Sequence, residues 1–115
     1  MLTYRKMMIP IFEVGLKVYI FDDWSEIEDI VGDHRPSKGL TTTTGNPINV
    51  FIDRKHPSTI VHEAEHIKNF IWEYIGYTPQ RDNDEVDAYL LKYLYNKIVT
   101  VFYKHIGRDP RDMID

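Results

Sequence analysis

The hydrophobic pattern of the chain changes at Pro57, and this change constrains the fold more than any other feature of the sequence. Before Pro57, apolar residues stand in short β-branched and aromatic runs bounded by turn residues, which is typical of strands. After Pro57, apolar residues recur every three or four positions over two long stretches, which is typical of amphipathic helices. The sequence therefore predicts an α+β domain in which a small mixed or antiparallel sheet and a short helix pack on two long helices.

The first half of the chain is expected to supply the sheet. One β-branched and aromatic run, Ile11–Phe21, predicts a strand, and a short helical pattern follows over residues 24–31 and ends at Gly32. Two further β-prone runs, Leu40–Thr44 and Ile48–Ile52, are separated by the tripeptide Gly-Asn-Pro. A turn of this composition between two such runs predicts a β-hairpin.

The second half of the chain is expected to form the two long helices. The first follows Pro57, which a first helical turn tolerates, and ends at Gly76. The second runs from about Asp84 to Lys104, and its apolar arc is wider than a surface helix needs. This second helix is therefore either the central core helix or part of a self-association face. In the latter case the chain would form a homo-oligomer.

Composition limits the classes of function. With 115 residues, the chain is long enough for one hydrophobic core, so residues 1–106 are expected to form a single domain and the charged tail 107–115 to be flexible. The absence of cysteine leaves histidine and carboxylate side chains as the ligands for any metal ion. Lysine and arginine are scattered and the formal net charge is −4, so nucleic acid is not an expected partner. No apolar run is long enough to span a membrane, so we expect a cytoplasmic protein without a membrane partner.

The first long helix carries an H-E-x-x-H motif, His62-Glu63-Ala64-Glu65-His66. Residues four apart project from the same face of an α-helix, about 6 Å apart along its axis, so the two imidazoles can bind one ion. Glu63 lies beside them, where its carboxylate can act on a water molecule at that ion. With five histidines and seven glutamates in the chain, the pattern should arise by chance about 0.01 times. The alternative is a polar helix stripe that merely faces solvent.

Two histidines leave a catalytic zinc ion one protein ligand short. A carboxylate at the start of the second helix is the expected source, and we favour Glu85, with Asp84 and Asp87 as rivals. The connector between the helices is long enough to bring the chain back to the ion. The structural alternative for Glu85 is a capping-box pair with Asp82 at the helix N-terminus.

These residues also carry a resemblance to a known family. The run Ser58–His66, followed by Glu85 within Asn83–Tyr89, resembles the gluzincin type of zincin. More narrowly, it is similar to the very small H-E-x-x-H proteins of phages and prophages that are regarded as metallopeptidases. The resemblance covers residues 59 to about 95, and it covers the preceding hairpin only in outline.

The resemblance implies a zincin-like domain in which His62, His66 and Glu85 bind Zn²⁺ and Glu63 is the general base. It implies a zinc-dependent metallopeptidase that hydrolyses peptide bonds through a zinc-bound water. It further implies that an edge strand of the sheet binds an extended chain, so that the expected partner is a peptide or protein substrate.

A catalytic site also needs a group besides zinc to stabilise the oxyanion. Tyr89, one helical turn beyond Glu85, is the candidate, with Tyr77 and His34 as further choices. The alternative for Tyr89 is packing between the two long helices. Two other classes of function stay open: a zinc-stabilised but catalytically idle interaction module, and a metal-free structural or regulatory protein of phage type.

Overall fold

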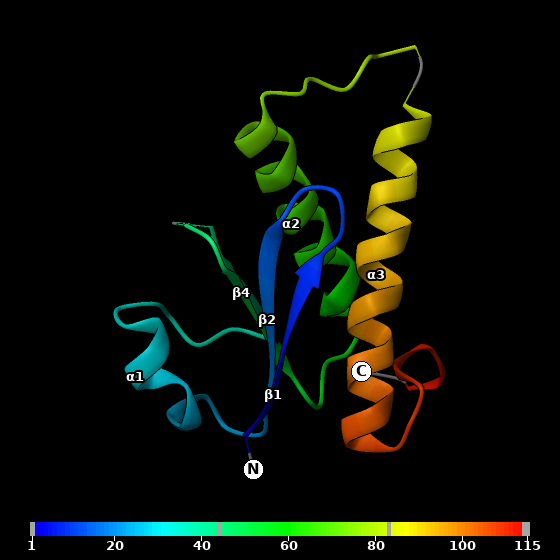
Figure 1. The fold of residues 1–115 in the computed structure, drawn as a ribbon. Coiled ribbons are helices and arrows are strands. Elements are labelled where there is room, and N and C mark those ends of the chain that lie inside the picture. The colour runs from blue at the N-terminus through cyan, green and yellow to red at the C-terminus, as the bar shows by residue number, and fades with distance from the viewer. Residues whose placement is uncertain (1, 44, 83, 114–115) are drawn as a thin grey trace.

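The computed structural model describes residues 2–43, 45–82 and 84–113. The elements follow one another as β1 (Thr3–Ile9), β2 (Val14–Phe21), the 3₁₀ turn η1 (Trp24–Glu26), α1 (Glu28–Val31), β3 (Gly39–Thr42), β4 (Ile48–Asp53), α2 (Thr59–Ile75), α3 (Glu85–Ile106) and the 3₁₀ turn η2 (Pro110–Asp112). The two long helices lie together against one face of a four-stranded sheet (Figure 1). The α+β class and its coarse arrangement are therefore confirmed.

The sheet is mixed, with the strand order β1-β2-β4-β3. The central strands β2 and β4 are parallel, and each is joined to an antiparallel edge strand, β1 or β3. The predicted hairpin is confirmed as the β3–β4 pair, which aligns Thr41 with Val50. The sheet therefore leaves β3, the strand next to α2, at an edge.

The beginning of the chain differs from the expectation. The strand predicted from residue 11 begins at Val14, because Ile11 and Glu13 have φ angles of 72° and 55° in the turn that joins it to β1. The strand β1 was not predicted. Its side chains are mostly exposed, and the sequence there lacks a clear apolar alternation.

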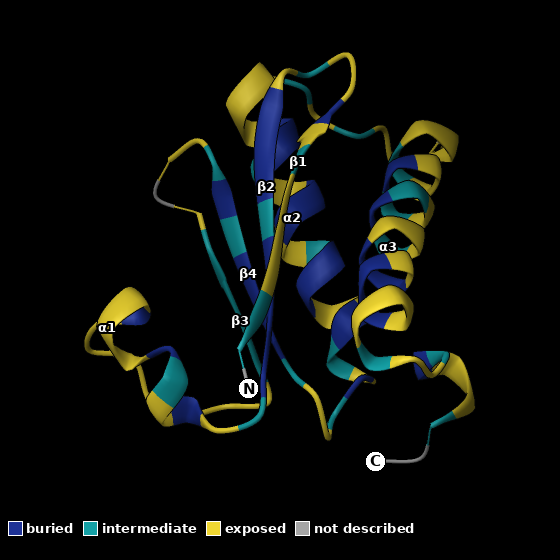
Figure 2. Ribbon diagram, turned by 60° about the horizontal axis from the view of Figure 1, so that its bottom comes forward, coloured by how far each residue is buried: buried dark blue, intermediate teal, exposed yellow. Residues whose placement is uncertain are grey.

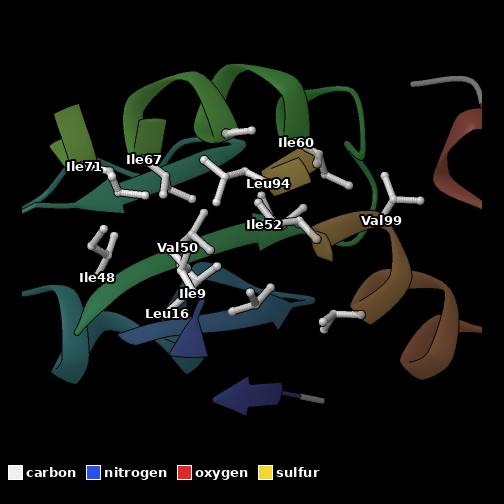
Figure 3. Packing of buried hydrophobic residues seen from close by; sticks show 14 of the residues in the cluster. Ile9, Leu16, Ile48, Val50, Ile52, Ile60, Ile67, Ile71, Leu94 and Val99 are labelled. Atoms are coloured by element: carbon white, nitrogen blue, oxygen red, sulfur yellow. The ribbon is translucent and has the colours of Figure 1, made fainter. Parts of the chain in front are cut away.

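The main core lies between the sheet and the two long helices. Alternate residues of β2 and β4 point into it and meet the inner faces of α2 and α3 (Figure 3). The labelled part of this cluster comprises Ile9, Leu16, Ile48, Val50, Ile52, Ile60, Ile67, Ile71, Leu94 and Val99. A second cluster on the other face of the sheet packs Tyr19, Phe21 and Phe51 against η1 and α1. The sheet is thus covered on both faces, and α2 is held firmly by its apolar side.

The helix α2 ends at Gly76 as predicted, whereas α3 continues two residues past the predicted Lys104 to Ile106. Gly76 and Gly107 each take the left-handed conformation that stops a helix. Most of the predicted apolar arc of α3 is buried within the chain itself, with Leu94, Ile98 and Phe102 fully buried, but Val86 at its N-terminal end is exposed. The second helix is therefore a core helix. Figure 2 shows the opposite, outward surface of α3 as exposed.

The described part of the tail also differs from the expectation. Pro110 is buried and begins η2, which Asp109 caps by accepting a hydrogen bond from the backbone of Arg111. The sequence does not predict this turn, because the tail shows no apolar periodicity. None of the helices in the described part of the chain is long and apolar enough to cross a membrane.

Candidate functional site

The predicted histidine pair is brought together on the outer surface of α2. His62 and His66 lie one turn apart, both are exposed, and their Nε2 atoms are 3.1 Å apart. The rings meet edge to face, with centroids 4.7 Å apart. Two imidazole nitrogens at this distance either share one proton in a hydrogen bond or bind one cation in its place.

Glu63 lies beside the pair but is almost completely buried, with an exposed fraction of 3%. Each of its carboxylate oxygens accepts a hydrogen bond from a threonine. Thr41 Oγ1 on β3 donates to Oε1 at 2.8 Å, and Thr59 Oγ1, one turn earlier on α2, donates to Oε2 at 3.2 Å. These two bonds fix the orientation of the carboxylate and compensate for its burial.

The close approach of β3 to α2 depends on Gly39. A Cβ atom at this position would lie 2.6 Å from Thr59 Oγ1, 2.8 Å from Thr59 Cγ2 and 3.0 Å from Glu63 Oε2. The two distances to Thr59 are shorter than real Cβ contacts allow, and the distance to Glu63 is tighter than most real contacts. The strand therefore approaches the helix at a position where only glycine fits.

A hollow of about 280 Å³ lies between β3 and the motif. Its lining consists of Gly39, Leu40, Thr41, Thr43, His62, Glu63 and His66. The two histidines and the buried carboxylate thus face one open space, which the edge strand borders. The space is large enough to admit several water molecules or a short segment of a ligand.

Next to this hollow, the outer side of β3 carries backbone groups that do not pair with β4, and one of them, the Gly39 carbonyl, accepts a hydrogen bond from Ser37 Oγ at 2.6 Å. The Asp53 N–H donates to the Lys38 carbonyl at 2.9 Å, and these two residues are directly opposite in the antiparallel register. Because hydrogen-bonded pairs alternate along an antiparallel ladder, Leu40 also faces β4, whereas Gly39 and Thr41 direct their N–H and C=O groups away from it. An extended chain could pair with this edge.

The opposite flank of α2 is tied to α3 by a buried ion pair. Lys68 has an exposed fraction of 5%, and its Nζ donates to Asp87 at 2.8 Å and lies 2.9 Å from a Glu65 carboxylate oxygen. The Trp72 indole donates to the other oxygen of Asp87 at 2.7 Å.

This network sets two pKa values. Burial alone would lower the pKa of Lys68, but the carboxylates of Asp87 and Glu65 outweigh it and raise that pKa. Burial alone would raise the pKa of Asp87, but the donors Lys68 and Trp72 outweigh it and lower that pKa. Both groups are therefore held in their charged forms.

The predicted third ligand is not brought to the histidines. Glu85 is exposed at the first position of α3, and Asp84 precedes it as the N-cap residue. Among the described residues, no three His, Cys, Asp or Glu side chains form a group that could hold a metal ion. The rival Asp87 is occupied by Lys68 and Trp72, as described above. The capping box expected from Asp82 is absent, because α3 begins two residues later and Asp84 makes no side-chain cap bond.

The three residues considered for stabilising the oxyanion do not lie beside the histidine pair. Tyr89 has an exposed fraction of 66% and does not line the hollow, so it is neither beside the motif nor packed between the helices. Tyr77 packs on Trp72, with ring centroids 4.7 Å apart, and His34 lies in an exposed loop. None of these three side chains lines the hollow beside the histidines.

Sequence reasoning missed the residues that support Glu63. Thr41 belongs to a threonine run that we interpreted only as β-favouring, and nothing in the sequence links it to a residue 22 positions later. Thr59 is the first residue of α2, and its hydroxyl bonds to Glu63. Its position four residues before the glutamate was the only local signal.

Comparison with family models, curated proteins and solved structures finds no match to this chain.

Proposed function

We propose that this chain is a zinc-dependent metallopeptidase in which His62 and His66 bind the metal and Glu63 is the general base. The observation that carries the proposal is the convergence of the two Nε2 atoms, 3.1 Å apart, on a hollow that a buried, oriented carboxylate also lines. A solvent-facing polar stripe would not require both threonine bonds to Glu63.

The spacing of the histidines fits a zinc ion. Two nitrogens bound to one tetrahedral zinc at about 2.0–2.1 Å are about 3.3–3.4 Å apart, close to the observed separation. Neutral imidazole is a preferred zinc ligand, and the contact between the two Nε2 atoms would be replaced by their bonds to the ion. When bound, zinc would act as a Lewis acid that polarises a carbonyl group and makes water more acidic.

Within this proposal, the residues of the chain handle the proton. Glu63 accepts a proton from the attacking water and later transfers it to the leaving amine. Thr41 and Thr59 hold its carboxylate toward the hollow, so that little reorientation is needed during the reaction. The substrate is an extended peptide that pairs with the outward N–H of Gly39 and the outward N–H and C=O of Thr41, because the Gly39 carbonyl already accepts from Ser37 Oγ.

Glu85 remains the predicted third ligand in this proposal. The alternative to Glu85 as a ligand is a metal site with two protein ligands, in which water or substrate takes the remaining coordination positions. A Glu85→Gln variant separates the two, since zinc affinity should fall by a factor of about 10 or more if the carboxylate binds the ion.

The metal is tested by its content in protein purified without added zinc. We expect close to one zinc per chain, with loss of the metal in His62→Ala and in His66→Ala. His105→Ala, which removes an exposed histidine near the end of α3, is the matched control. Unchanged zinc content in the first two variants would rule out this metal site, and no zinc in any of the proteins would favour the metal-free structural or regulatory class.

Catalysis is tested by cleavage of a random peptide library. We expect the wild-type protein to cleave and Glu63→Gln, which keeps the size of the side chain, to be inactive. Equal product from both proteins would rule out the peptidase. A zinc-loaded but inactive wild type would favour the interaction module, although α2 and α3 are already joined without metal through Lys68 and Asp87.

A further inference from the structure

A second, larger hollow lies between the start of α2, the middle of α3 and the C-terminal tail. Its volume is about 650 Å³, within the range of about 300–1,000 Å³ that is typical of small-molecule sites. It shares no lining residue with the hollow beside the histidines. We name it the tail groove, and its apolar lining comprises Pro57, Val61, Ala88, Leu91, Pro110 and Met113.

The tail is folded back to build one wall of this groove. Asp109 accepts a hydrogen bond from the Arg111 backbone N–H at 2.9 Å and another from its guanidinium Nη2 at 2.6 Å. These bonds hold the turn η2, in which Pro110 is buried, and Met113 packs against the main core. Figure 1 shows this part of the tail beside α3. The groove therefore has walls from three segments and is more than the exposed face of one helix.

The walls leave apolar surface open to solvent. Val61 on α2 has an exposed fraction of 51%, although it lies between Pro57 and the buried Ala64 along the helix. Leu91 on the facing helix is half-buried. Covering such surface with an apolar body is favourable, because it removes water from both.

The polar part of the lining carries one positive charge without a partner. Lys92 is exposed, and its ammonium group has neither an ion pair nor a hydrogen bond with any residue that the structure describes. None of the residues three or four positions away from it on α3 is acidic. The second cation of the lining, Arg111, is already bound by Asp109. Asp112, the other acidic residue of η2, does not line the groove.

The acidic residues nearest to the groove do not neutralise this charge. Glu65 on α2 and Asp87 on α3 are both bound by Lys68. Glu85 lies seven residues before Lys92, which is about 10 Å along the helix axis and beyond the reach of an ion pair. No acidic side chain belongs to the lining. The tail groove therefore combines apolar walls with a single available cation.

We propose that the tail groove binds a medium-chain fatty acid, an unbranched acyl chain with one terminal carboxylate. The acyl chain lies along the apolar walls, and the carboxylate meets the Lys92 ammonium group. Tyr95 lies three residues further on the same face of α3, and its hydroxyl makes no hydrogen bond with the described residues, so it can donate to the second oxygen.

The composition of the groove selects this class of ligand. One available cation matches one negative charge, whereas a dianionic phosphate needs more donors than Lys92 and Tyr95 offer. Tyr95 carries the only ring among the residues that line the groove. An aromatic body would gain from further rings to stack on, whereas a flexible chain packs well against aliphatic walls.

The first experiment titrates octanoate into ¹⁵N-labelled protein without added metal and follows the amide chemical shifts. We expect saturable shifts centred on Val61, Leu91 and Lys92, with a dissociation constant of about 0.1–1 mM. Octylammonium, which has the same chain and the opposite charge, should bind at least about 10-fold more weakly. Absence of saturable shifts up to about 10 mM octanoate, or equal binding of the two compounds, overturns the proposal.

The second experiment repeats the octanoate titration on variants of the groove. Ala88→Glu and Ala88→Gln add side chains of the same size, but only the first places a negative charge one helical turn before Lys92. We expect Ala88→Glu to bind octanoate at least about 5-fold more weakly than Ala88→Gln. An equal loss in both would mean that Lys92 does not hold the carboxylate, and would overturn the proposal.

A pair of lysine variants completes the test. Lys92→Gln should weaken octanoate binding about 5-fold. Lys104→Gln, which changes an exposed lysine in the last turn of α3 outside the lining, should leave it unchanged. Equal effects of the two substitutions overturn the proposal, and thermal unfolding verifies that every variant is folded. None of these measurements depends on bound metal or on peptide cleavage, so their outcome is independent of the proposed function.

Discussion

Replacing Gly39 by alanine should separate β3 from the motif helix. The new methyl group would be 2.6 Å from Thr59 Oγ1, about 0.8 Å inside the 3.4 Å of an ordinary contact. Rotation of the threonine cannot relieve this contact, because its Cγ2 is 2.8 Å from the same point. Either β3 moves outward or Thr59 gives up its bond to Glu63.

The expected loss of stability follows from these contacts. Overpacking of a methyl group costs about 1–3 kcal/mol, and a strained or lost hydrogen bond adds about 1 kcal/mol. The reduced freedom of alanine in the unfolded chain offsets about 0.4–1 kcal/mol of this. We therefore expect Gly39→Ala to lower the free energy of unfolding by about 2 kcal/mol, equivalent to a fall in Tm of about 8 °C.

Urea unfolding of Gly39→Ala and Gly45→Ala tests this expectation. Gly45 lies in the turn of the same hairpin, and a Cβ there would meet no atom within 4 Å. Its replacement should leave stability unchanged or raise it by up to about 1 kcal/mol. If Gly39→Ala is as stable as Gly45→Ala, β3 does not pack closely against Thr59 and Glu63, and the Glu63 carboxylate is not oriented by these contacts.

Two further predictions concern the bonds on either flank of α2. Thr41→Val should lower the free energy of unfolding by about 1–2 kcal/mol, because the buried Glu63 carboxylate loses one hydrogen-bond donor. Thr41→Ser keeps the hydroxyl and should unfold like the wild type. Equal urea midpoints for the two variants would contradict this prediction. Asp87→Asn should cost about 3 kcal/mol near pH 7 because Lys68 stays buried without its main partner. The folded state lowers the pKa of Asp87, so the stability that its carboxylate contributes is fully present above about pH 4 and is lost as the pH falls through the folded pKa. The difference in unfolding free energy between wild type and Asp87→Asn should therefore shrink toward pH 2. A difference that does not change with pH would contradict the ion pair.

The elements that the sequence predicted well are those determined by local signals. Gly76 ends α2 by taking a positive φ, and the Gly-Asn-Pro turn places β3 beside β4. The strand β1 was not predicted because most of its own side chains are exposed and its sequence lacks an alternating apolar pattern. The turn η2 was not predicted because Pro110 is its one buried residue, which gives no apolar pattern in the sequence.

The same distinction applies to the candidate site. The approach of His62 to His66 follows from helix geometry, so the sequence alone predicted it. The bond from Thr41 to Glu63 depends on the distance between a strand and a helix, which no local pattern encodes. A third ligand from α3 depends on tertiary geometry in the same way, and the rival Asp87 proves to bind Lys68 and Trp72.

The positions of these bonds around α2 lead to a last prediction about the histidines. Lys68 follows His62 by six residues, which places it about 240° around the helix, on the flank that meets α3. Glu63 lies on the other flank and meets β3 through Thr41. The histidines project between these two anchors and are exposed, so the packing of the helix does not depend on them.

His62→Ala and His66→Ala should therefore change the free energy of unfolding in metal-free buffer by no more than about 0.5 kcal/mol. Added zinc should raise the stability of the wild type, because a ligand that binds only the folded state stabilises it, and should not raise that of either variant. Urea unfolding with and without zinc measures both effects. A large loss of stability in the metal-free variants would mean that the pair serves the fold, and loss of metal on substitution would then no longer identify a metal site.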